Sequence, residues 1–446
     1  MASPLTPVAT LLVRFAVSLV LLVAIPGLLA GCGSRSRELQ PGAYRAVLTT
    51  PGGDLPFELD VAAEEGRFVL QLINGDERVR VSEVTVKDGT LHAIMPGYEN
   101  SLSARVSGGR LEGQVSLLRA DGERQALPFG AEIGQTWRFF EEPVTDNADV
   151  SGRWSVTFTD VAGTTSPGVA ELTQLFGTVT GTILTPTGDH RYLAGEMRGD
   201  ELHLSRFDGA QADLYRARLN ERGDLVGEYW SGRFLHRRFV ATRSADAVLD
   251  TSTVATALRD PGARFGFSFK DLDGQPVALS DPRFEGKVVI VTLAGSWCPT
   301  SHDEAAFLSG LHRKYRDQGL EVVALMFEHY REFPQAAAAV RRFRDKLGIE
   351  YVNLIAGASD LAAASRALPQ LTGVHAYPTT IFVDRDGRVR KIHAGFTGPA
   401  TEQHYDALTA EFTQLVESLL AEPVADSGSA TDGPRPGAVP DVVSAP

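Results

Sequence analysis

The sequence predicts a multidomain α+β protein, in which an antiparallel, β-rich N-terminal region precedes a C-terminal α/β domain. The chain has 446 residues, which is enough for two or three domains of ordinary size. Residues 42–245 contain short alternating apolar segments separated by Asn-Gly and Asp-Gly pairs, a pattern typical of β-hairpins. From residue 261 onward, apolar strands alternate with helical segments, which predicts an α/β layer fold.

The composition is that of a folded protein that does not bind nucleic acid. The chain is 43% hydrophobic and 22% charged, which excludes a wholly disordered, collagenous or polytopic membrane protein. Its net charge of −13 argues against a polyanionic partner, because nucleic-acid binding needs a concentrated basic face. Only two cysteines are present, Cys32 and Cys298, so a disulfide-stapled scaffold and a cysteine-rich zinc site are both excluded.

The first 31 residues have the pattern of a bacterial lipoprotein signal peptide. One charge, Arg14, precedes the apolar run 15–30, which is short for a membrane-spanning helix but suits the hydrophobic region of a signal peptide. The run ends in Leu29-Ala30-Gly31-Cys32, which resembles a lipobox. The alternative is an uncleaved anchor with an incidental cysteine.

The lipobox resemblance implies that Cys32 carries diacylglycerol and becomes the first residue of the mature chain. The following domains are then expected in the bacterial cell envelope, anchored to a membrane through the lipid on Cys32. Gly33, rather than Asp, follows the cysteine. Resemblance to sorted lipoproteins therefore favours the periplasmic face of the outer membrane, where the cell has one. Residues 32–41 are expected to form a tether.

The β-rich region, residues 42–245, divides into two similar halves at about 42–140 and 150–245. A weak internal repeat of about 110 residues connects them. It pairs residues 42–45 with 151–154, 89–92 with 200–203, and 111–113 with 225–227. The economical interpretation is a duplicated β-sheet or half-barrel, joined through residues 135–140.

Three residues of the second half, Asp189, His190 and Asp208, could suggest a catalytic or metal site. They show no repeated ligand spacing, and Thr-Gly-Asp and Phe-Asp-Gly are normal hairpin sequences. We therefore interpret them as turn residues.

The C-terminal domain is expected at residues 261–421, after a linker at 246–260 and before a disordered tail at 422–446. The tail is rich in proline and poor in aliphatic bulk, so it cannot form a core. Strands are expected at 287–293, 320–327, 351–355 and 380–383, helices at 302–318, 334–347, 360–368 and 401–420, and hairpins at 271–274 and 386–387.

Two motifs in this domain form a specific pair. Trp297-Cys298-Pro299 stands at a strand-to-helix junction within residues 286–299, and Tyr377-Pro378-Thr379 follows about 80 residues later within residues 376–387. Together they closely resemble the thioredoxin superfamily, and within it the TlpA/ResA-like exported thiol–disulfide oxidoreductases. With the hairpin at 271–274 and the final helix, the resemblance covers about 160 residues. The β-rich region resembles the region ahead of the thioredoxin-like domain in some TlpA-type proteins, which implies architecture but no defined activity.

A cysteine in the first turn of a helix faces unpaired backbone N–H groups and the positive end of the helix dipole, and both favour the thiolate. The resemblance implies catalytic roles for Cys298, for Pro378 as the cis-proline, and for Glu304 as a carboxyl that assists proton transfer. Glu304 fits equally a helix-start carboxylate that complements the dipole. The active-site neighbours that the resemblance implies are Trp297, Pro299, Thr300, Ser301, Tyr377 and Thr379.

The sequence departs from the family at the second cysteine of the Cys-x-x-Cys motif, where Ser301 stands. A serine hydroxyl is far less acidic than a thiol and cannot attack a mixed disulfide under ordinary conditions. If Cys32 is lipidated, Cys298 is the one free thiol of the mature chain, and the usual dithiol cycle is closed to it.

Three functions fit this motif. Cys298 can act as a monothiol whose mixed disulfide is resolved by a second thiol, in exchange with a small thiol or with a thiol- or disulfide-bearing protein of the envelope. The domain can instead be a redox-inactive module that binds a peptide or a partner protein. A third function is an antioxidant peroxidase of the one-cysteine peroxiredoxin type. However, the threonine and proline which that family places before its cysteine are Gly295 and Val291 here.

The histidines of the C-terminal domain do not indicate a further catalytic or metal-binding site. His302 could raise thiolate character through its charge, but the more economical expectation is an exposed first-turn residue. His329, His375 and His393 show no ligand spacing with acidic residues. We predict no metal site and no cofactor.

Overall fold

The computed structural model describes residues 38–142 and 144–423. The lipobox with Cys32 and nearly all of the expected tail lie outside these residues. Within them, no helix combines the length and the apolar character needed to cross a membrane.

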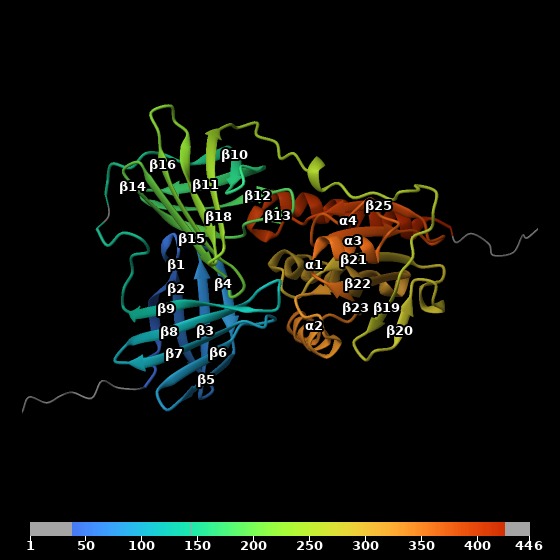
Figure 1. The fold of residues 1–446 in the computed structure, drawn as a ribbon, viewed down its shortest axis with the longest axis horizontal. Helices are drawn as coiled ribbons and strands as arrows, with labels where there is room; N and C mark the ends of the chain where they lie inside the picture. Colours follow the sequence, from blue (N-terminus) through green and yellow to red (C-terminus); the bar gives the residue numbers. More distant parts are fainter. Residues whose placement is uncertain (1–37, 143, 424–446) are drawn as a thin grey trace, which may run out of the picture. The chain divides into compact units, whose positions relative to one another are not determined.

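The first half of the β-rich region is one antiparallel sheet of nine strands, in the order β4-β3-β2-β1-β9-β8-β7-β6-β5 (Figure 1). Side chains alternate between its two faces, so that Tyr44, Ala46 and Leu48 of β1 enter the core while their neighbours are more exposed. The strands are β1 (Gly42–Thr50), β2 (Gly53–Glu64), β3 (Arg67–Asn74), β4 (Glu77–Val81), β5 (Glu83–Lys87), β6 (Thr90–Ile94), β7 (Ser101–Ser107), β8 (Arg110–Leu118) and β9 (Arg124–Ile133).

The second half is a second antiparallel sheet, in the order β11-β10-β18-β17-β16-β15-β14-β12-β13. An additional pairing between β11 and β12 joins its two sides, so that β10, β11, β12 and β14–β18 form a closed ring. The strands are β10 (Gly152–Asp160), β11 (Thr165–Leu175), β12 (Thr178–Thr185), β13 (Gly188–Asp189), β14 (Leu193–Arg198), β15 (Glu201–Phe207), β16 (Ala212–Leu219), β17 (Leu225–Ser231) and β18 (Leu235–Arg243).

The sequence repeat falls on strands that occupy corresponding places in the two sheets. Its three segment pairs lie in or next to β1 and β10, β6 and β15, and β8 and β17. In each sheet the first strand pairs antiparallel with the last, β1 with β9 and β10 with β18. The region is therefore strongly β-rich and antiparallel, as the hairpin pattern predicts.

The C-terminal domain has a seven-stranded mixed sheet in the order β20-β19-β23-β22-β21-β24-β25. β21, β22 and β23 are parallel, and the outer strands run antiparallel to their neighbours. The strands are β19 (Ser268–Asp271), β20 (Pro276–Ala278), β21 (Val288–Ala294), β22 (Leu320–Glu328), β23 (Val352–Ala358), β24 (Thr379–Val383) and β25 (Val389–Ala394). The helices are α1 (Pro299–Tyr315), α2 (Phe333–Leu347), α3 (Leu361–Ala367) and α4 (Gln403–Ala421).

The first helix of this domain begins earlier than the sequence pattern predicts. We expected a helix over 302–318, but α1 begins at Pro299, directly after Cys298. Proline is favoured at the first helical position, because the N–H that it lacks would have no intrahelical partner there and because its φ angle is already helical. The difference matters, because it makes Cys298 itself the N-cap residue.

The central strand β21 precedes that helix in the chain. All seven of its residues are buried, and alternate residues contribute to two different hydrophobic clusters. One cluster holds Ile290 together with residues of α1, α2 and α4, and the other holds Val291 together with Ala364 of α3. Burial on both faces is typical of a central parallel strand and fixes the end of β21 firmly.

Candidate functional site

Cys298 lies where β21 ends and α1 begins. Its backbone conformation is extended, and its carbonyl accepts the first helical hydrogen bond, from the His302 N–H at 3.2 Å. The Cys298 sulfur faces the Tyr377 carbonyl oxygen at 3.7 Å, and the Tyr377–Pro378 peptide bond is cis. The structure thus brings the two sequence motifs together, although about 80 residues separate them.

The thiol of Cys298 is buried, with 7% of the residue exposed. Burial raises its pKa, because a thiolate is poorly solvated there, while hydrogen bonds from Ser301 and Thr300 act in the opposite direction. The helix-start geometry that we expected to favour the thiolate is therefore present. Desolvation outweighs it, and the thiol is held protonated to a higher pH than an exposed cysteine.

Ser301 occupies the position of the missing second cysteine, one helical turn after Cys298. It is fully buried, and its hydroxyl accepts a long hydrogen bond from the Gly295 N–H at 3.5 Å. Cys298 is the one free cysteine within the described residues. An intramolecular disulfide cannot form among them.

Cys298 shares a hydrophobic cluster with Tyr377, and Trp297 packs against that cluster. Trp297 is half-buried, donates its indole N–H to the Phe327 carbonyl at 2.9 Å, and stacks on His329 with ring centroids 4.4 Å apart. Tyr377 packs edge-on against the same indole at 5.7 Å. On the cis-proline segment, the Thr379 hydroxyl donates to the Ala376 carbonyl at 2.8 Å.

Glu304 is buried in the first turns of α1, with 1% of the residue exposed. Its carboxyl accepts hydrogen bonds from the hydroxyls of Thr292 on β21 and Thr380 on β24. Burial raises its pKa to about 7. A solvated helix-start carboxylate would be exposed, whereas a carboxyl that titrates near neutrality suits proton transfer.

A second buried carboxyl, Glu328, was not found by sequence reasoning. It ends β22, and it accepts hydrogen bonds from the Ser296 N–H at 2.9 Å and the Ser296 hydroxyl at 2.6 Å. Burial raises its pKa to about 7. Glu328 therefore holds the loop that precedes Cys298, and the available signal was an acidic residue directly after the apolar run 322–327 of β22.

His302 corrects one expectation. It is buried rather than exposed, stacks on Tyr98 with ring centroids 4.3 Å apart, and shares a hydrogen bond of 2.8 Å between its Nε2 and the Ser296 carbonyl. Burial lowers its pKa to about 4. The ring is neutral near pH 7, so it cannot stabilise a thiolate by its charge.

In the second sheet, Asp189 and Asp208 make the hydrogen bonds expected of turn residues. Asp208 accepts hydrogen bonds from the N–H groups of Ala210 and Gln211, and Asp189 accepts one from the N–H of Arg191. His190 shares a hydrogen bond with the Tyr215 hydroxyl. No group of three or more His, Cys, Asp or Glu residues in the described part of the chain could hold a metal ion.

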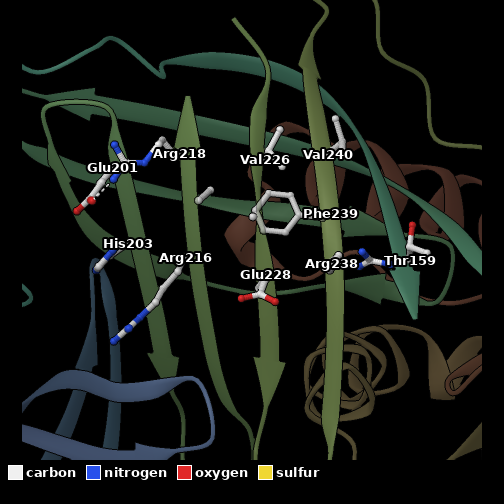
Figure 2. Close-up of a pocket in the computed structure, with 12 residues that line it drawn as sticks. Thr159, Glu201, His203, Arg216, Arg218, Val226, Glu228, Arg238, Phe239 and Val240 are labelled. Atoms are coloured by element: carbon white, nitrogen blue, oxygen red, sulfur yellow. Dashed lines mark hydrogen bonds and ion pairs between the residues drawn. The ribbon is translucent and has the colours of Figure 1, made fainter. Parts of the chain in front are cut away.

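Another cavity lies on the second sheet. It has a volume of about 620 Å³ and is lined by side chains of β10 and β15–β18 (Figure 2). Arg218 is already paired with Glu201 and Asp200. Because the residues that line this groove include no cysteine, we assign the thiol chemistry to the surroundings of Cys298. The charged or titratable residues that line the groove of the second sheet are Glu201, His203, Arg216, Arg218, Glu228 and Arg238.

Comparison with known proteins points to the same domain. Residues 259–408 match the Redoxin family model. The chain is 28% identical over 151 residues to the thiol-disulfide oxidoreductase ResA of Halalkalibacterium halodurans, covering 34% of this chain and 73% of that protein. It is 27% identical over 143 residues to ResA of Geobacillus thermodenitrificans, covering 32% and 74%.

A solved structure, a thioredoxin-family thiol:disulfide interchange protein of Chlorobium tepidum, is 21% identical, with 37% of this chain and 99% of that chain covered and a TM-score of 0.28. The family match together with the sheet order identifies the C-terminal region as a thioredoxin-like domain.

Proposed function

We propose that this protein carries out thiol–disulfide exchange through the single cysteine Cys298. The observation that carries the proposal is the position of this thiol: it caps α1 and faces the backbone of the cis-proline segment, where a substrate disulfide would be bound. The relatives that match this domain are named as thiol-disulfide oxidoreductases.

In the proposed reaction, the Cys298 thiolate attacks one sulfur of a substrate disulfide. That S–S bond breaks, a Cys298–substrate disulfide forms, and the leaving thiolate takes up a proton. Because Ser301 cannot resolve the adduct, an external thiol attacks the Cys298 sulfur, releases the bound half of the substrate as a thiol and forms a disulfide with Cys298. A second external thiol then attacks the external sulfur of that disulfide, which breaks the bond to Cys298 and regenerates its thiol. Over a full cycle one disulfide is reduced and two external thiols are oxidised to a disulfide. The resemblance to TlpA/ResA-like proteins gives the proton exchange to Glu304, whose carboxyl contacts Thr292 and Thr380 and whose pKa of about 7 suits both donation and acceptance.

The location is part of the same proposal. We infer that Cys32 is lipidated and that the protein is anchored in the cell envelope, with the periplasmic face of the outer membrane favoured by Gly33. The support is the lipobox at the end of a signal-length apolar run. Labelled fatty acid should enter the wild type and not Cys32→Ala, and equal incorporation into both would contradict the inference.

For the β-rich region we propose a duplication, in which the two sheets descend from one nine-stranded unit. The support is that the sequence repeat falls on corresponding strands and that each first strand pairs with its last.

A redox-inactive binding module is the second candidate, and one observation favours it: Cys298 is buried and burial raises its pKa, as in unreactive structural cysteines. A peroxidase is less well supported, because Tyr377, Ser301 and Thr300 are the partners that the described structure gives the sulfur, and none of them is a cation.

The test is adduct formation. Incubation with the oxidised disulfide of a short peptide should add one half of that disulfide to the peptide containing Cys298, and dithiothreitol should remove it. A protein whose Cys298 alkylates with iodoacetamide but never forms this adduct would be a binding module instead.

A further inference from the structure

Loops of the β-rich region contact the residues on both sides of Cys298. We call them the covering loops and define them as residues 95–100, 118–122, 186–191 and 208–210. On one side of the thiol, a cavity of only about 30 Å³ lies among Tyr98, Leu118, Ala210, Ser296 and Trp297. The covering loops therefore leave room for about one water molecule beside the Trp297 ring.

On the other side of the thiol, the loop 186–191 lies against the start of α1. Arg191 donates to the Pro299 carbonyl at 3.3 Å and to the Asp303 carboxylate at 2.6 Å. A Cβ atom on Gly188 would stand 2.9 Å from the Thr300 side chain, so the backbone approaches as closely as a glycine allows. These contacts fall on the first turns of α1, on residues 299, 300 and 303.

Arg191 joins three parts of the chain. Besides Asp303 of α1 it pairs with Glu77 of the first sheet at 2.8 Å and with Asp208 of the second at 3.6 Å. Its own backbone has a φ of 52°, a left-handed conformation that costs energy in an arginine. Arg191 therefore adopts a strained backbone conformation and holds its buried cation against α1, the helix that Cys298 caps.

Tyr98 completes the cover. Its ring stacks on His302, and a Cβ atom on the adjacent Gly97 would stand 2.8 Å from the same imidazole. Burial raises the pKa of the Tyr98 hydroxyl well above its ordinary value, and Asp208, Asp303 and Cys298 raise it further. The phenol therefore lies within electrostatic reach of both the thiol and the Arg191 cluster.

We propose that the covering loops set the specificity of Cys298 by size, admitting disulfides and thiols of single amino acids or short peptides and excluding folded proteins. This rests on the proposed exchange function and names its substrate class. The loops occupy the surface beside the thiol that a protein substrate would need, and 7% exposure leaves a narrow approach. Tyr98 and Arg191 are positioning residues in this arrangement, and neither takes part in the exchange itself.

The experiment compares two alkylating reagents on the full chain, iodoacetamide and a maleimide carried on a long polyethylene glycol chain. Labelling of the peptide containing Cys298 is followed by mass spectrometry, so that Cys32 does not interfere. The wild type should react much more slowly with the bulky reagent than with the small one, relative to an unstructured peptide of the same local sequence.

Two independent variants should open the cover. Gly97→Ala drives a methyl group into the His302 ring, and Arg191→Met removes the cation that joins the three elements. Each should raise the bulky-to-small labelling ratio at least about tenfold, since losing one partner of a buried ion pair or forcing a clash strongly shifts an open–closed equilibrium.

Gly66→Ala is the matched control. Gly66 has the same φ as Gly97, +79°, but no atom lies within 4 Å of its Cβ position, so it carries the backbone cost without the contact. Its ratio should equal that of the wild type. If Arg191→Met does not fold, the labelling ratio of Gly97→Ala compared with that of Gly66→Ala still tests the proposal.

Equal ratios in the wild type, in both opening variants and in the control would overturn the size-selection inference. The exchange function fails differently: Cys298 would alkylate with iodoacetamide yet form no adduct with a small disulfide.

Discussion

The strands of the β-rich region and the central strand of the thioredoxin-like domain differ in which side chains are buried. Along β10 of the second sheet, buried Trp154, Val156 and Phe158 alternate with more exposed neighbours, whereas every residue of β21 is buried. A strand covered on both faces ends in a fixed place, and Cys298 follows the end of β21 closely, as the N-cap of α1. The alternating sheets instead end in loops, and four of these contact the surroundings of the thiol.

The comparison teaches that chemistry and access are encoded in different parts of the chain. The thioredoxin-like domain supplies the thiol, the cis-proline segment and two buried carboxyls. The β-rich region supplies no nucleophile to the site, but its Tyr98 and Arg191 contact α1 beside the thiol. The predictions below separate these two contributions.

The largest effect is expected from Cys298→Ser, which removes the nucleophile. Adduct formation with any small disulfide should disappear, while the fold should persist, because serine is slightly smaller and Tyr377 still offers its carbonyl to a hydroxyl. Mass spectrometry of the intact chain measures the adduct. Undiminished adduct in Cys298→Ser, mapped to the peptide that contains Cys32, would show that the reaction does not need the thiol of this domain.

Ser301→Cys should convert the monothiol site into a dithiol. Ser301 is buried, and it hydrogen-bonds to Cys298 from one turn along α1, so two thiols there would lie on one face of the helix. Mild oxidation should consume both thiols and link residues 298 and 301, and catalytic reduction of a short-peptide disulfide should rise. Thiol titration and peptide mapping measure the bridge.

A folded Ser301→Cys variant without the bridge would mean that the local geometry differs from that of a thioredoxin site. A bridge without any gain in reductase activity would favour the binding module.

Glu304→Gln tests the buried carboxyl through pH. The folded pKa, about 7, lies above the ordinary value of 4.5, so the wild type loses stability as pH rises through that interval. A shift of this size corresponds to on the order of 3 kcal/mol across the interval. Glutamine does not titrate, so it removes this pH-dependent loss of stability. The free energy of unfolding of the variant should therefore rise relative to that of the wild type between about pH 5 and about pH 8.

Urea unfolding at the two pH values measures this difference. The Glu328→Gln variant is the comparison, because Glu328 has a similarly raised pKa but binds Ser296 instead of two threonines. A pH-independent difference between wild type and Glu304→Gln would mean that the carboxyl is already ionised at low pH.

The smallest effect is expected from Arg218→Ala in the groove of the second sheet. Arg218 is mostly exposed and its partners are Asp200 and Glu201, so its loss should leave the labelling ratio and the adduct rate at Cys298 unchanged. A change in either quantity would connect the groove to the thiol and break the separation of the two regions.

The sequence predicts much of the fold and part of the site. Hairpin pairs, the repeat and the strand–helix alternation predict both regions, because these are local signals, but the helix pattern placed the start of α1 at residue 302 instead of Pro299. Glu328 and the burial of His302 were missed, because each depends on a partner far along the chain, Ser296 and Tyr98. The covering loops were missed for the same reason: turn chemistry at Asp208 is local, but its pairing with Arg191 is not.

The central claim, that Cys298 works as a monothiol, is tested most directly by the dependence of turnover on an external thiol. Reduction of a short-peptide disulfide by the full chain is followed while the concentration of a small thiol is varied. We predict one adduct per chain and no further turnover without the external thiol, and a rate that rises in proportion to its concentration when it is added. Repeated turnover with a dithiol-specific donor alone, in the absence of any small thiol, would contradict the account.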